Sequence, residues 1–397
     1  MRLSTLCIGV LVPFNLTIAA EPAAGPARGS FNPDISLILA GGYSQLSNDP
    51  DGYAIPGFML GAETGPGKRG LTLAESELIM SANVDDLFYG QLTAAVTPEN
   101  EIELEEAYVQ TLGLAPGVTL RAGRFYSGIG YLNSQHPHSW DFADTALPYR
   151  AMLAGQYGDD GVRLAWVAPT ELFIELGGEW LRGANFPAGG DGNDGQGVAT
   201  VFAHLGGDVG ASHAWRVGVS YLQAEVAERL SGDVEQAPDA FSGDSQLAIA
   251  DLVWKWAPQG NAKQTNFKFQ AEYLWRAEDG VFTADVNNVA GGPVVDAYSA
   301  RQSGWYAQAV WQFVPRWRTG VRYDQVDTGE LSAGANSALF DTGGWTPRRA
   351  SAMVDWSHSE FSRVRVQWTR DRSRPDTGSE LRLQYIMSLG AHGAHAF

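Results

Sequence analysis

The sequence of 397 residues lacks long hydrophobic runs, and it has few charged residues, one cysteine and only four lysines. After the N-terminal segment no run of about 18 apolar residues occurs, which excludes a helical membrane protein. Charged residues make up 18% of the chain, whereas an average soluble protein has about 25%. The aromatic content of 11% argues against disorder. A formal net charge of −18 argues against nucleic acid as a partner.

The N-terminal segment, residues 1–20, has the features of a cleaved signal peptide. Arg2 supplies the positive charge at its start, an apolar stretch follows, and two alanines end it. The alternative is an uncleaved membrane anchor, but Pro13 and Asn15 interrupt a stretch that is already short for a span. The only cysteine, Cys7, lies in this segment, so the mature chain is expected to contain no disulfide.

Alternation of apolar and polar residues with a period of two dominates the rest of the sequence. From Asn266 to Arg276 the chain reads NFKFQAEYLWR, which places apolar residues on one face and Lys268, Gln270 and Glu272 on the other. Three further segments repeat this pattern over similar lengths. Such alternation predicts β-strands with one apolar face.

Two fold classes are compatible with these strands, a soluble β-sandwich and a transmembrane β-barrel. The distribution of charge favours the barrel, because charged residues in the middle of a strand face suit a water-filled lumen better than a dry core. Tryptophans also gather near strand ends on the apolar face, as in the aromatic girdles of membrane barrels. These tryptophans are Trp254, Trp256, Trp275, Trp305 and Trp317.

The number of strands and the lengths of their connections predict the topology. We count sixteen strands, an even number, with short turns alternating mostly with long loops, as in bacterial outer-membrane barrels. We therefore predict an all-β fold, a transmembrane antiparallel β-barrel in the bacterial outer membrane, with short periplasmic turns and long outer loops. We expect residues 21–34 to form a periplasmic leader and residues 35–397 to form the single barrel domain. The predicted strands begin near Ile35, Leu71, Leu87, Ile102, Val118, Gly161, Leu172, Val198, His213, Gln246, Asn266, Gly304, Trp317, Arg348, Phe361 and Glu380.

Charged side chains on the polar strand faces are expected to line the lumen. Early strands contribute mostly carboxylates and late strands mostly arginines, so one wall is partly acidic and the opposite wall basic. Such a split produces a transverse field, and the basic wall favours anions; for any single residue, merely keeping the lumen hydrated is the simpler interpretation. The predicted pore-lining residues are Glu75, Glu77, Glu106, Arg121, Arg163, Lys268, Arg276, Arg318, Arg322, Arg363, Arg365 and Arg382.

The loop from Gly128 to Asp160 follows the fifth predicted strand, where sixteen-stranded porins fold their constriction loop inward. Its H-x-H pair, His136 and His138, has a carboxylate nearby in Asp141, and these donor types suit Zn²⁺ or Cu²⁺. The alternative is a surface loop whose histidines hydrogen-bond to the neighbouring backbone. No resident cofactor is predicted, and zinc enters only as a bound or transported ligand.

Several segments resemble known outer-membrane families. The terminal Phe397 is typical of barrels of this class, and the architecture resembles the sixteen-stranded porins, including the phosphate-selective group. More specifically, the chain resembles small outer-membrane proteins often named zinc-regulated or TonB-dependent receptors. The segments that carry this resemblance are Phe31–Ser36, Glu75–Asp86, Ala122–Asp144, Gln156–Gly161 and Gly390–Phe397. The resemblance implies uptake of zinc or a zinc chelate, and likeness to the porins implies a homotrimer.

The sequence carries no signature of an enzyme active site. G-x-S-x-G, H-E-x-x-H, the phosphate-binding glycine loop and the dinucleotide fingerprint are all missing, so we expect no catalysis. The leading hypothesis is a porin-like channel for selective diffusion of small hydrophilic solutes or ions. The alternative is an outer-membrane receptor for zinc or a zinc chelate. A third class, a structural barrel plugged by its own loops, predicts neither conductance nor metal binding.

Overall fold

The computed structural model describes residues 33–61, 64–189, 193, 195–233, 237–289 and 291–390. The predicted signal peptide, nearly all of the leader and the terminal Phe397 lie outside these described residues. Within the described part, no helix has the length and apolar character needed to cross a membrane.

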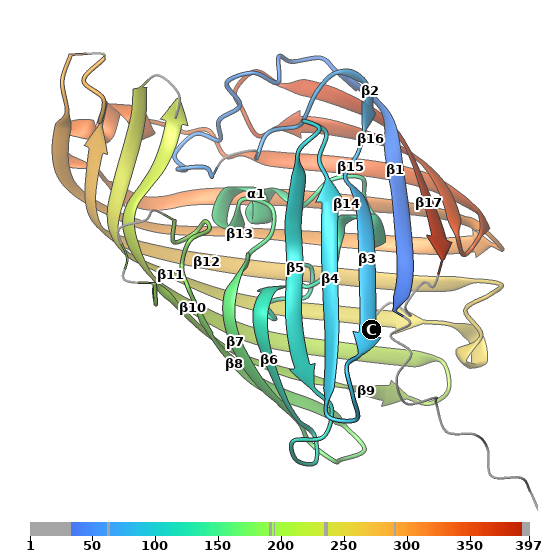
Figure 1. Cartoon of the computed structure of the whole chain (residues 1–397). Helices are drawn as coiled ribbons and strands as arrows, with labels where there is room; N and C mark the ends of the chain where they lie inside the picture. The colour runs from blue at the N-terminus through green and yellow to red at the C-terminus, as the bar shows by residue number, and fades with distance from the viewer. Residues whose placement is uncertain are drawn as a thin grey trace, which may run out of the picture. The chain divides into compact units, whose positions relative to one another are not determined.

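All strands belong to one antiparallel sheet that closes on itself, because β1 pairs with β17 on one side and with β2 and β3 on the other (Figure 1). Since β2 and β3 both pair with β1, they are two segments of one interrupted strand, and the barrel has sixteen strand positions. The strands are β1 (Asp34–Leu46), β2 (Gly70–Leu73), β3 (Ser76–Asn83), β4 (Phe88–Val96), β5 (Ile102–Thr111), β6 (Val118–Tyr126), β7 (Gly158–Val167), β8 (Phe173–Leu181), β9 (Val198–Val209), β10 (His213–Asp233), β11 (Ala237–Trp256), β12 (Asn266–Ala284), β13 (Val294–Val314), β14 (Trp317–Ser332), β15 (Arg348–Ser359), β16 (Ser362–Arg372) and β17 (Gly378–Gly390). The helices are α1 (Leu147–Leu153) and the 3-10 turns η1 (Pro137–Ser139), η2 (Pro258–Gly260) and η3 (Gly334–Phe340).

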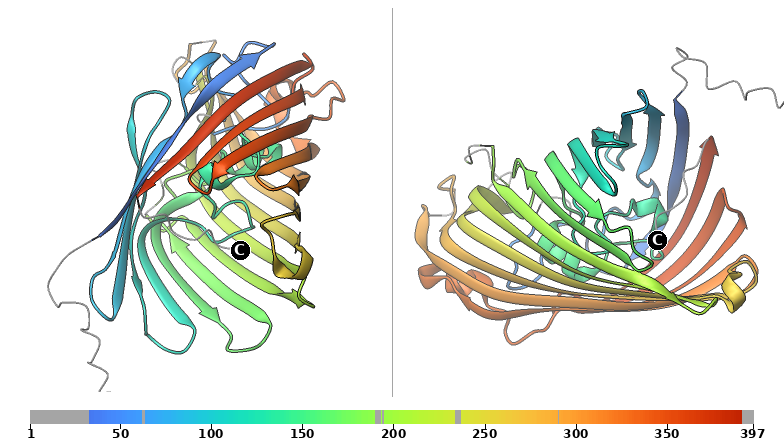
Figure 2. Two further views of the ribbon diagram at one scale, coloured as in Figure 1. Left: turned by 90° about the vertical axis from the view of Figure 1, so that its right-hand side faces the viewer. Right: turned by 90° about the horizontal axis from the view of Figure 1, so that it is seen from below.

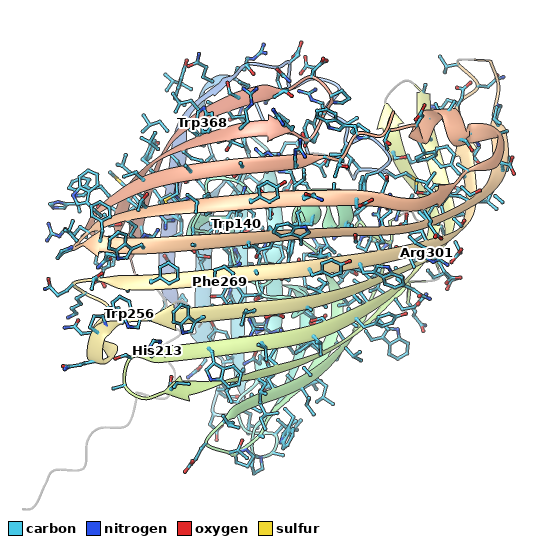
Figure 3. The ribbon with its side chains drawn as sticks, turned by 180° about the vertical axis from the view of Figure 1, so that it is seen from behind. Trp140, His213, Trp256, Phe269, Arg301 and Trp368 are labelled. Carbon is cyan, nitrogen blue, oxygen red and sulfur yellow. The ribbon has the colours of Figure 1, made fainter. Side chains whose placement is uncertain are left out.

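The outer surface of the barrel is apolar, and in strands such as β13 and β15 successive residues alternate between more and less exposed positions. Many leucine, valine and aromatic side chains of the strands are exposed, and Figure 3 shows side chains projecting from the strands on the side hidden in Figure 1. Trp254, Trp275, Trp305 and Trp317 of the predicted girdle are all exposed on this surface. A closed sixteen-stranded antiparallel barrel with an apolar outer face is the fold of an integral protein of the bacterial outer membrane.

The strands differ strongly in length around the barrel. The strands β3 to β8 have 8 to 10 residues each, close to the 9–11 or so that cross a bilayer, whereas β10 to β13 have 19 to 21. From the sequence we predict long outer loops at residues 223–245 and 277–303, and the structure corrects this prediction, because both segments are mostly strand. Their ladders continue through polar residues and glycine, which an apolar pattern does not reveal.

The barrel interior has two parts. The part of the interior away from the short turns is packed with buried apolar side chains from β10 to β14, from α1 and from the loop after β1. This loop contributes Ile55, Phe58 and Met59. Figure 2 shows α1 and the chain around it enclosed by the wall of strands. The part near the short turns is polar instead. The candidate site lies where the two parts meet.

Candidate functional site

The loop of residues 127–157 joins β6 to β7 and lies inside the barrel, where glutamates of the wall hold its first residues. Glu272 of β12 accepts hydrogen bonds from the backbone N–H groups of Tyr131, at 3.0 Å, and Leu132, at 2.9 Å. Glu179 of β8 accepts one from the N–H of Gly128 at 2.8 Å. Buried N–H groups need such partners, so these two glutamates explain why the loop turns inward rather than outward.

The second half of this loop is attached to the basic wall through Asp144. Its carboxylate lies 2.9 Å from Arg150 of α1, 2.8 Å from Arg322 of β14 and 2.7 Å from Arg349 of β15, and Gln367 donates a hydrogen bond to it at 2.7 Å. Burial raises the pKa of Asp144, but the guanidinium groups of Arg349, Arg322 and Arg150 hold that pKa well below its usual range. Asp144 is therefore ionised at neutral pH.

Asp141 makes a similar attachment nearer the short turns. Its two oxygens lie 3.0 Å from Lys268 Nζ of β12 and 2.9 Å from Arg318 of β14. Arg363 donates to the backbone carbonyl of His138, and Arg365 donates to that of Trp140 at 2.6 Å. The loop's aspartates and carbonyls thus meet the arginines of the late strands.

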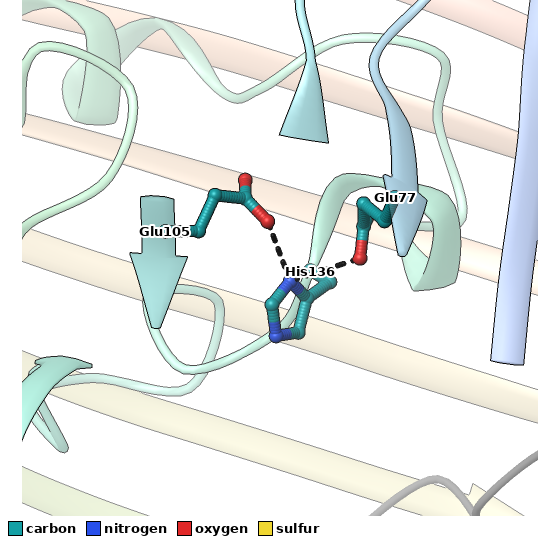
Figure 4. Close-up of side chains that lie close together, drawn as sticks. All are labelled: Glu77, Glu105 and His136. Atoms are coloured by element: carbon teal, nitrogen blue, oxygen red, sulfur yellow. Dashed lines mark ion pairs between the residues drawn. The ribbon is translucent and has the colours of Figure 1, made fainter. Parts of the chain in front are cut away.

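The histidines of the loop point the other way, toward carboxylates on β3 and β5, as Figure 4 shows for His136. His136 Nδ1 lies 3.2 Å from Glu77 Oε2 and 3.4 Å from Glu105 Oε2, and His136 Nε2 lies 3.0 Å from Glu106 Oε2. His138 Nδ1 lies 2.7 Å from Glu77 Oε1. One loop therefore bridges an acidic wall and a basic wall.

Glu105 was not among the predicted lining residues, and a β-bulge brings it inward. Alternation allows only one of the neighbours Glu105 and Glu106 to face the lumen. The pairing of β4 with β5 shifts between Thr93, opposite Glu106, and Ala94, opposite Leu104. The extra residue lets both carboxylates face His136. The only signal in the sequence is the run of acidic residues itself.

The polar part of the lumen contains a cavity of about 1670 Å³ beneath the loop, on the side of the short turns. Both histidines of the loop and Asp141 line it. Of the predicted pore-lining residues, those that line this cavity are Glu106, Arg121, Arg163, Lys268, Arg318 and Arg363.

The other predicted lining residues lie inside the wall but are covered. Arg276 is fully buried and donates to Gln302 at 3.1 Å and to the carbonyl of Ala151 in α1 at 3.3 Å. Inward-folded loops fill the outer lumen, and alternation along a strand cannot reveal that they do. The histidines of the loop cover Glu77, and the rest of the loop covers Arg322 and Arg365. Arg382 donates a hydrogen bond to the carbonyl of Pro66 in the loop after β1. Glu75 lies in the break between β2 and β3.

The predicted metal-ligand set is divided between the two walls. His136 and His138 lie together on the acidic wall, with ring centroids 5.7 Å apart. Asp141 lies with Lys268 and Arg318 instead, so it does not join the histidines. The carboxylates that do join them come from strands far away in the sequence, Glu77 and Glu105.

Solved structures of outer-membrane porins and channels share this fold. OmpT of Vibrio cholerae, as a loop L8 deletion mutant, matches with a TM-score of 0.54 and 10% identity, covering 90% of this chain and 99% of that one. The outer membrane channel DcaP of Acinetobacter baumannii gives 0.53 and 11%, covering 90% and 97%. An anion-selective porin of Comamonas acidovorans gives 0.51 and 8%, covering 90% and 99%. The protein is therefore of the sixteen-stranded outer-membrane barrel class.

An uncharacterized protein of Aquifex aeolicus is 32% identical, and the match covers 93% of this chain and 80% of that protein. The chain belongs to the same family as this protein. No model of a known protein family matches the chain. Neither this relative nor the three structures support the zinc-regulated or TonB-dependent name that the sequence motifs suggested.

Proposed function

We propose that this protein is an outer-membrane channel for selective diffusion of small hydrophilic solutes or ions. The observation that carries the proposal is the loop of residues 127–157, which crosses the barrel between walls of opposite charge and bounds a polar cavity. A loop in this position sets the narrowest part of the path, and the charges beside it set which ions pass.

The charges around the cavity favour anions. Nine basic and six acidic side chains line it, although the whole chain has a formal net charge of −18. Four of the basic residues, Lys255, Lys268, Arg318 and Arg363, come from the wall of late strands. A local excess of positive charge raises the concentration of anions at the constriction.

Planar-bilayer recording of the refolded protein in a KCl gradient tests this function. We expect stable single-channel steps and a reversal potential of the sign that indicates preference for chloride. Protein shown to be folded by its heat-dependent gel mobility that nevertheless gives no steps would overturn the proposal. Steps with preference for potassium would contradict the assignment of selectivity to the basic wall.

A receptor for zinc or a zinc chelate is the second candidate, favoured by the convergence of Glu77 and Glu105 on His136. It predicts saturable uptake of zinc, whereas the channel predicts flux that rises linearly with solute concentration. OmpT of Vibrio cholerae also occurs in a trimer form, and we propose a homotrimer here, to be checked by cross-linking in the membrane.

A further inference from the structure

We propose that Glu77, Glu105 and His136 form a binding site for one divalent transition-metal ion, which ties the inward loop to the wall of β3 and β5. The inference concerns binding alone and does not depend on the proposed conduction. Its basis is the geometry of three donor atoms and of the groups behind them.

Three donor atoms converge on one point at the edge of the cavity. Glu77 Oε2, Glu105 Oε2 and His136 Nδ1 all lie within 4.8 Å of one another. The nitrogen is 3.2 Å from one oxygen and 3.4 Å from the other. Ligands at about 2.1 Å from a tetrahedral zinc ion lie about 3.4 Å apart, so these distances fit such an ion.

None of the three converging atoms has a hydrogen-bond partner, although each is buried. The side chain of Glu77 is fully buried, and that of Glu105 is 6% exposed. Buried carboxylate oxygens without a hydrogen bond are costly, and two of them aimed at one nitrogen need a positive charge between them. A metal ion at this point would satisfy all three atoms at once.

The opposite atom of each ligand is already held by a second residue. His138 Nδ1 lies 2.7 Å from Glu77 Oε1, and the hydroxyl of Tyr126 donates to Glu105 Oε1 at 2.9 Å. Glu106 Oε2 lies 3.0 Å from His136 Nε2. In a neutral ring this contact places the proton on Nε2 and leaves the lone pair of Nδ1 directed at the site, as in carboxylate–histidine–metal arrangements.

The charge balance and donor types define the class of ion. The ion pairs of Glu77, Glu105 and Glu106 among the described residues are all with histidine, so the site has surplus negative charge. Two oxygens and one imidazole nitrogen suit Zn²⁺, Fe²⁺ or Mn²⁺ better than Ca²⁺, which prefers six or more oxygens, or Cu(I), which prefers sulfur. His136 lines the cavity, which gives the ion an entry path and water for its remaining positions.

Titration calorimetry of the full chain in detergent with Zn²⁺, and absorption spectroscopy with Co²⁺ as a probe, test the site. His392 and His395 near the C-terminus are replaced by asparagine in every sample, so that they cannot contribute binding. We expect one equivalent of Zn²⁺ to bind, and Co²⁺ to develop visible bands of low-symmetry coordination. E77Q, E105Q and H136N should each weaken binding by more than about 100-fold, and E106Q by about 10- to 100-fold.

The matched control is E175Q. Glu175 pairs with His204 at 2.8 Å on another part of the wall, so this variant removes a histidine-bound carboxylate without touching the proposed ligands. It should bind Zn²⁺ as the background chain does. Absence of stoichiometric binding by the background chain overturns the proposal and shows that a proton holds the cluster instead. Equal weakening by E175Q, or unchanged affinity of both E77Q and E105Q, overturns the ligand assignment. If E77Q does not fold, the zinc affinity of E105Q and the Co²⁺ spectrum of the background chain still test the proposed site.

Discussion

The two walls that hold the inward loop use the same kind of residue pair in different ways. On the basic wall the loop contributes carboxylates, and Asp144 is surrounded by Arg150, Arg322 and Arg349. On the acidic wall the strands contribute the carboxylates, and the loop contributes His136 and His138. Guanidinium groups are charged at every physiological pH, whereas imidazoles are not. The ion pairs with the basic wall are therefore permanent, whereas charge compensation at the acidic wall depends on a proton or a metal ion.

The carboxylates that join the loop to the two walls also differ in how completely their oxygens are hydrogen-bonded. Both oxygens of Asp144 accept hydrogen bonds, and the two carboxylate oxygens of Asp141 accept hydrogen bonds from Lys268 and Arg318. The acidic wall keeps carboxylate oxygens of Glu75, Glu77 and Glu105 without hydrogen bonds. The basic wall thus fixes the position of the loop, and the acidic wall offers a binding site.

The largest effect is expected from breaking the basic wall with Asp144→Asn. The amide leaves three guanidinium groups around a neutral side chain that is 4% exposed in the native protein, and breaking a buried ion pair costs about 3–5 kcal/mol. We expect the loop to detach, so that single-channel conductance rises and the free energy of unfolding by urea in lipid vesicles falls. Unchanged conductance in a folded variant would show that the loop does not limit the path.

The strand positions could be predicted from the sequence, because a membrane barrel needs an apolar outer face on every strand. All sixteen predicted starts fall within or beside an observed strand. The ends were harder to predict, since β10 to β13 continue past the bilayer, where no apolar pattern is required. The alternation of apolar and polar residues also gives no sign of the break between β2 and β3.

The candidate site could be predicted only in part. The inward loop and the split of charge followed from the order of strands and the phase of the alternation. Glu105 was missed because a bulge changes that phase, and Asp141 was wrongly grouped with the histidines because it lies near them in sequence. Which wall each loop side chain reaches depends on the path of the loop, and no local pattern encodes it.

A smaller effect should follow from neutralising the cavity side of the basic wall with K268Q and R318Q together. Both side chains line the cavity, and one unit charge about 4 Å from an ion changes its energy by about 1 kcal/mol in water, a factor of about five. We expect the chloride preference to fall by at least that factor, measured by the reversal potential in a KCl gradient. E175Q, which removes a negative charge that also lines the cavity, should shift the reversal potential in the opposite direction. Shifts of the same sign would contradict the electrostatic origin of selectivity.

The smallest effect is expected from Glu77→Gln in metal-free buffer, and it sharpens the contrast with Asp144→Asn because both changes turn a buried acid into its amide. Glu77 loses its ion pairs with His136 and His138, but the substitution also removes one negative charge from beside Glu75 and Glu105. The relieved repulsion offsets part of the lost attraction, so the free energy of unfolding in the presence of a chelator should fall by less than it does for Asp144→Asn. Urea unfolding of both variants in the same vesicles measures the difference directly. A loss at Glu77 as large as that at Asp144 would mean that imidazolium groups hold the acidic wall as firmly as arginines hold the basic one, and that no metal ion is needed there.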